Sequence, residues 1–117
     1  MIEAEMNEPM SAAKGAIETE AAAVGLAIPW MLILQIVMEL FSGCGEDPTP
    51  EEMKQRAASP GLFTRLRGYR IARRHLGWNE NRRTVEAALN VGFKAVGQME
   101  TPQLAKLADA AKQLAGE

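Results

Sequence analysis

The apolar and polar positions along the chain repeat mostly at helical spacing, and few runs favour a β-strand. Residues 11–27 are mainly alanine and glutamate, both strong helix formers, and Ser11 stands where a helix N-cap is expected. The pair Ile28-Pro29 then interrupts the pattern, because the residue before a proline is disfavoured in the helical conformation. The first helix is therefore expected to end just before Pro29.

A second helix is predicted over Pro29–Phe41, and it is almost wholly apolar. Two glycines in residues 42–45 allow a left-handed stop. Along this helix Gln35, Glu39 and Ser42 fall at positions i, i+4 and i+7, which places them in one narrow polar stripe. We expect the stripe to face water and the rest of the helix to be buried, either by its own chain or by copies of it.

The second half of the chain predicts shorter amphipathic helices. Residues 46–50 form a loop that leads into a helix start at Thr49-Pro50, with a cap, a first-turn proline and a glutamate at capping-box spacing. A turn at residues 59–61 precedes a helix over 62–76, which ends at Gly77. On that helix one apolar face is expected to hold Leu62, Leu66, Tyr69 and Leu76.

Two more helices complete the pattern. One runs over residues 80–98 with an apolar stripe, and the last begins at Thr101-Pro102. The stripe of the first holds Val85, Ala88, Leu89, Phe93 and Val96, and that of the second holds Leu104, Leu107, Ala108, Ala111 and Leu114. The sequence thus predicts an all-α protein, a small bundle of about five helices around one strongly apolar central helix.

The domain organisation follows from the same pattern. Residues 1–10 read as an acidic N-terminal tail, and residues 11–117 as a single helical domain. Within that domain we distinguish an acidic and apolar half (11–45), the loop (46–50) and a basic, then neutral, helical half (51–117).

Composition adds a separation of charge to this picture. The net charge is −2, yet residues 1–50 carry eight acidic and one basic side chain, whereas residues 51–83 carry nine basic and three acidic ones. Aromatic residues make up 5% of the chain, which suits helices packed by aliphatic and small side chains. The asymmetry of charge between the two segments indicates either an anionic partner for the basic segment or neutralisation of one segment by the other.

The apolar helix is the first candidate for function. Residues 21–38 contain no charge and reach the lower limit of a membrane span, but Pro29, the alanine-rich first half and the lack of flanking basic residues oppose one. A membrane is therefore the less favoured partner. Because the other helices are modest, we expect the chain to be oligomeric. The expected apolar interaction residues are Trp30, Ile33, Leu34, Val37 and Phe41.

The arginine-rich helix is the second candidate. Arg67, Arg70 and Arg74 share one stripe, and Arg82 and Arg83 follow just beyond it. Guanidinium groups match phosphate oxygens bidentately, so these residues could bind a nucleic-acid backbone without reading sequence. The sequence pI near 5.5 is unlike that of a typical nucleic-acid-binding domain. We favour pairing with acidic side chains of the same chain or of a neighbour.

Other chemistry has little support. Ala72, Gly77 and Val85 are too widely spaced for the tight turn of a DNA-reading helix-turn-helix, which leaves an ordinary corner between helices. His75 is the only histidine and has no nucleophile beside it in sequence, and the single cysteine, Cys44, is expected to be inert. No spacing typical of a metal site or of a glycine-rich phosphate loop is present, so we expect no catalytic residue, metal or cofactor.

These observations predict a non-enzymatic structural or interaction protein. No secretory signal precedes the domain, so the expected location is the cytoplasm or a particle assembled there. The protein would self-associate or dock into a larger assembly, of which a virion or similar particle is one form, with its arginine-rich helix on an acidic partner surface. The alternatives are a nucleic-acid-binding accessory protein and a single-pass membrane protein.

Overall fold

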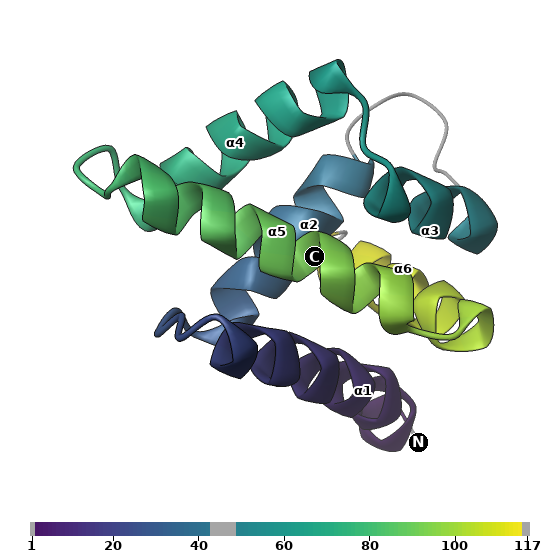
Figure 1. Ribbon diagram of the computed structural model, residues 1–117. Helices are drawn as coiled ribbons and strands as arrows, with labels where there is room; N and C mark the ends of the chain where they lie inside the picture. Colours follow the sequence, from purple (N-terminus) through teal and green to yellow (C-terminus); the bar gives the residue numbers. More distant parts are fainter. Residues whose placement is uncertain (1, 43–48, 116–117) are drawn as a thin grey trace.

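The computed structural model describes residues 2–42 and 49–115, and in those residues the only regular secondary structure is α-helix (Figure 1). The all-α prediction is confirmed, with six helices in the described residues where the sequence predicted about five. The helices are α1 (Ile2–Ala23), α2 (Trp30–Ser42), α3 (Pro50–Ala58), α4 (Leu62–Leu76), α5 (Arg82–Gln98) and α6 (Thr101–Ala115). Cys44, the predicted glycine stop after Ser42 and most of the loop 46–50 lie outside the described residues.

Helix α1 differs from its prediction at both ends. It begins at Ile2, so residues 2–10 are helical and do not form a separate tail before an N-cap at Ser11. Glutamate, alanine and methionine dominate residues 2–10, and all three favour a helix. The helix ends at Ala23, ahead of the predicted break at Pro29, because Gly25 takes a φ of 68° that permits a left-handed stop.

The end of α1 is a Schellman turn, and this turn shapes the corner that leads into α2. The N–H of Leu26 donates to the carbonyl of Ala21 at 2.9 Å, and the N–H of Gly25 donates to that of Ala22 at 3.2 Å. The chain then reverses direction. Pro29 precedes the first turn of α2, where a missing N–H costs nothing.

Helix α2 packs against α1, α4 and α5 of its own chain. Its buried side chains are Ile33, Leu34, Ile36, Val37, Leu40 and Phe41. The polar stripe lies as predicted: Gln35 and Ser42 are exposed, and Glu39 is half-buried with a polar partner described below. In Figure 1, α5 crosses in front of α2, while α1 and α4 lie below and above it.

Helix α5 contacts α1, α2, α3 and α4, and the five apolar residues predicted for its stripe are all buried. It begins at an N-cap, Asn81, whose side chain accepts a hydrogen bond from the N–H of Arg83 at 2.7 Å. Gly92 brings its backbone against Val37 of α2, since a Cβ atom at this position would overlap the valine side chain. The absence of a side chain at Gly92 therefore permits the α2–α5 contact.

Helices α3 and α6 pack against each other, with α3 also against α5 and α6 against α1. The predicted cap of α3 is confirmed: the Thr49 hydroxyl accepts from the N–H of Glu52 at 3.2 Å and lies 3.2 Å from its carboxylate. Met53 and Ala57 then enter the core, as do Leu104 and Leu107 of α6.

No described helix is long and apolar enough to cross a membrane. The uncharged run over residues 21–38 is divided by the corner between α1 and α2, and α2 has 13 residues. At about 1.5 Å per residue that helix spans about 20 Å, short of the roughly 30 Å hydrocarbon core of a bilayer.

Candidate interaction surfaces

Helix α4 packs through its small residues. Gly68 and Ala72 are buried together with Ile71, and a Cβ on Gly68 would lie 2.7 Å from a methyl group of Leu89 and 3.4 Å from one of Leu40. Small side chains let helix backbones approach closely, so the glycine and alanine turn this face of α4 toward α2 and α5. The opposite face, at the start of the helix, has no neighbour among the described residues.

This arrangement corrects the predicted orientation of α4. The sequence placed Leu62, Leu66, Tyr69 and Leu76 on one core-facing side, but only Tyr69 and Leu76 are partly covered. Leu62 is 70% exposed and Leu66 59%, and the adjacent Phe63 is 87% exposed. Three large apolar side chains therefore lie in water on the first turns of α4, close enough to form one patch.

The five arginines that were predicted to form an interaction surface divide into two groups. Three have partners inside the chain: Arg67 donates to the carbonyl of Leu40 at 3.1 Å, Arg74 pairs with Glu39, and Arg82 pairs with Glu86 at 3.1 Å. The other two, Arg70 and Arg83, are exposed, and like Arg65 their side chains have no hydrogen-bond or ion-pair partner in the described part of the chain.

Glu39 joins the acidic half of the sequence to the basic half. Its carboxylate pairs with Arg74 and lies 2.9 Å from Nε2 of His75, so one glutamate on α2 holds the last turn of α4. Partial burial on its own would raise the pKa of Glu39, but the hydrogen bonds and positive charge of His75 and Arg74 outweigh it and lower the pKa below its usual 4.5. The only histidine thus has a structural partner.

The corner between α4 and α5 is fixed by Arg73. Its guanidinium donates to the Tyr69 hydroxyl at 2.8 Å and to the carbonyl of Trp78 at 2.7 Å. It also lies 5.9 Å from the ring centres of both aromatic residues. Gly77 turns the chain with a φ of 106°. The result is an ordinary helix–loop–helix corner, with Trp78 exposed on its outer side.

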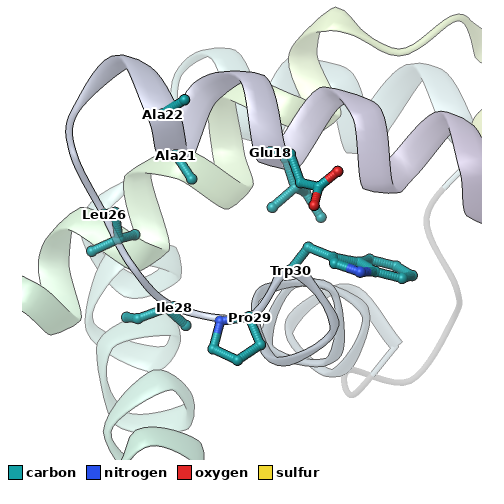
Figure 2. A pocket seen from close by; sticks show the side chains of 8 residues that line it. Glu18, Ala21, Ala22, Leu26, Ile28, Pro29 and Trp30 are labelled. Carbon is teal, nitrogen blue, oxygen red and sulfur yellow. The ribbon is translucent and has the colours of Figure 1, made fainter.

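A pocket of about 290 Å³ lies at the other corner, between the end of α1 and the start of α2 (Figure 2). Its walls come from the Schellman turn and the proline that follows it. The lining residues are Ile17, Glu18, Ala21, Ala22, Leu26, Ile28, Pro29 and Trp30. Glu18 is the only charged residue among them, it is exposed, and it makes no hydrogen bond or ion pair with another described residue.

The residues predicted for an apolar interaction surface occupy two different places. Ile33, Leu34, Val37 and Phe41 are buried in the core of the chain. Trp30 is half-buried and lines the corner pocket. Of the two roles considered for this helix, core anchor and oligomer interface, the structure gives these four side chains the first.

Sequence reasoning missed both exposed apolar surfaces. The exposure of Phe63 could have been predicted, because this large apolar residue falls outside the stripe expected to face the core. No sequence pattern indicated the pocket, because its shape depends on the turn geometry around Gly25. Among the described residues no cluster of three or more histidine, cysteine, aspartate or glutamate side chains is close enough to hold a metal ion.

Comparisons with known proteins give no relative. No protein-family model matches the chain, and neither curated proteins nor solved structures give a match.

Proposed function

We propose that this chain is a non-enzymatic interaction protein that docks into a multi-subunit assembly through the start of α4. The observation that carries the proposal is the α4 patch, which we define as Leu62, Phe63 and Leu66 with the flanking Arg65 and Arg70. Single exposed apolar residues are common on monomers, but a contiguous group of large ones marks an interaction site. Aromatic residues and arginine are also the types enriched in protein interfaces.

The burial of α2 supports α4 as the docking element. Since Ile33, Leu34 and Val37 fill the core, a partner could reach them only if the chain unfolded. Leu62, Phe63 and Leu66 already face water while the opposite side of α4 holds the helix in place. A partner surface with apolar and acidic groups would cover the three apolar side chains and pair with Arg65 and Arg70. An assembly in the cytoplasm, or a particle formed there, fits this proposal.

Nucleic-acid binding is the second candidate, and it has one observation in its favour. Arg65, Arg70 and Arg83 are exposed and have no side-chain partner in the described residues. Three guanidinium groups make a small phosphate-binding set, and the large apolar side chains beside two of them are better matched by a protein surface. We therefore rank protein docking first.

The test compares the size of the complex formed by the wild-type chain and by Phe63→Asp in the cells that make it. Native fractionation of lysates should show the wild-type chain in a complex larger than its 12.7 kDa monomer, and the variant should elute as monomer. Trp78→Asp, at an aromatic residue 66% exposed outside the patch, is the control and should stay in the complex. If wild type and Phe63→Asp elute alike, the proposed docking surface is wrong.

A further inference from the structure

Two exposed surfaces of complementary character lie on different sides of the molecule. The α4 patch is apolar and basic. The corner pocket is lined by apolar residues and by Glu18, whose carboxylate has no partner among the described residues. In Figure 1 the start of α4 lies at the top of the molecule, whereas the connection between α1 and α2 lies at the lower left. Because the two are separated by the body of the protein, they cannot meet within one chain.

We propose that the corner pocket of one copy receives the α4 patch of a second copy. This inference rests on the proposed function and names the partner as another molecule of the same chain. Phe63 enters the pocket against Leu26 and Pro29, and Arg70, which lies two turns further along the same side of α4, approaches Glu18.

The pocket suits a side chain better than a free ligand. Its volume of about 290 Å³ is at or below the lower end of the roughly 300–1,000 Å³ of small-molecule sites, and it opens to solvent. Figure 2 shows Leu26, Ile28 and Pro29 along the wall formed by the corner, with the carboxylate of Glu18 above Trp30. An aromatic side chain could cover those apolar walls while its neighbours neutralise the carboxylate.

The charges of the whole chain favour the same pairing. Residues 1–50, which supply the pocket, carry eight acidic side chains and one basic one, while residues 51–83, which supply the α4 patch, carry nine basic and three acidic ones. Part of this charge is neutralised inside the molecule. The ion pairs in the described residues are Glu39–Arg74, Glu8–Lys106, Glu52–Arg56 and Glu86–Arg82, besides the contact of Glu39 with His75. Glu18 in the pocket and Arg65 and Arg70 in the α4 patch are exposed and have no side-chain partner in the described residues, so they remain able to attract one another between copies.

The contact joins two different surfaces, so it is heterologous. Each copy would offer its α4 patch to one neighbour and its pocket to another. Such contacts close into a ring when the rotation between copies permits and otherwise continue as a filament. This geometry separates the proposal from a two-fold dimer in which two α4 patches meet.

The experiment uses purified full-length protein in sedimentation velocity over a range of concentrations. The average mass of the wild type should rise with concentration beyond that of a dimer. Phe63→Asp, which breaks the α4 patch, and Glu18→Arg, which reverses the charge in the pocket, should each stay at 12.7 kDa. An equimolar mixture of the two variants should form a species of twice that mass, because each still has the surface that the other lacks.

A matched charge reversal on another helix serves as the control. Asp109→Arg makes the same charge change at an exposed site of α6 and should assemble like the wild type; circular dichroism checks that every variant is folded. Assembly of Glu18→Arg at wild-type strength, or no complex in the mixture, would overturn the pairing. A wild-type protein that stays monomeric would also overturn the pairing. If a complex in cells nevertheless depends on Phe63, the α4 patch binds a different partner, such as another protein, an acidic membrane or a nucleic acid.

Discussion

Gly92 of α5 lies so close to Val37 of α2 that a Cβ atom on the glycine would overlap the Cγ2 methyl group of the valine. The two helices can pack at this distance only with hydrogen in place of a side chain. We therefore predict that Gly92→Ala lowers the free energy of unfolding by about 1–3 kcal/mol, the usual cost of overpacking a core. Urea titration followed by circular dichroism measures it.

Gly97 of the same helix is the matched control. It has no atom within 4 Å of the position that a Cβ would occupy, and its φ is not positive. Gly97→Ala should raise the free energy of unfolding by roughly 0.5–1 kcal/mol, because alanine loses less conformational freedom in a helix. Equal effects of the two substitutions would contradict the close α2–α5 contact.

The opposite environments of Ile33 and Phe63 give a second prediction. Ile33 is fully buried and Phe63 is 87% exposed. Ile33→Ala should cost about 2–5 kcal/mol of unfolding free energy, whereas Phe63→Ala should change it by no more than about 0.5 kcal/mol, although it removes the larger side chain. The comparison is made at low protein concentration by urea titration. A large loss at Phe63 would mean that α4 is packed differently.

Glu39 makes stability depend on pH in acid. Because its pKa is lower in the folded protein than its usual 4.5, the unfolded chain takes up a proton first as the pH falls. The stabilisation by Glu39 is therefore complete above the usual pKa and is lost as the pH drops toward the folded value. Wild type should exceed Glu39→Gln in unfolding free energy at pH 7, by less than about 1 kcal/mol since the pair is partly solvated. A difference that persists unchanged at pH 3 would contradict the assignment.

The sequence predicted most helix boundaries because local chemistry sets them. Thr49 caps α3, Gly77 ends α4 and Pro29 directly precedes α2, each by a property of that residue alone. The core-facing stripe of α5 was equally predictable, since the large apolar residues of this helix are also its buried ones.

The orientation of α4 could not be predicted from the sequence in the same way. Its apolar pattern favoured burying Leu62 and Leu66, but Gly68 and Ala72 allow a closer contact with α2 and α5. A glycine contributes little to a hydrophobic pattern, yet its small size decides which face of a helix can approach a neighbouring helix. The α4 patch, and the corner pocket formed around Gly25, were therefore visible only in three dimensions.

Binding to nucleic acid has a quantitative limit set by the free arginines. Only Arg65, Arg70 and Arg83 are without a side-chain partner among the arginines of the described residues. At roughly 0.9 counterions released per phosphate contact, binding to random-sequence duplex DNA should show a slope of log K against log salt no steeper than about −3. Fluorescence anisotropy at several salt concentrations measures the slope. A much steeper value would mean that basic side chains other than these three arginines also contact phosphates.

Helix α2 is buried within its own chain, and we propose that the exposed apolar residues at the start of α4 bind a partner. Thiol labelling of Ile33→Cys and of Phe63→Cys, each combined with Cys44→Ser, tests both parts at once. The cysteine at position 33 should stay protected at every protein concentration, whereas that at position 63 should react quickly in dilute solution and slowly once copies associate. Rapid labelling at position 33 in dilute folded protein, with protection appearing only on association, would show that α2 needs a second copy and would contradict the account.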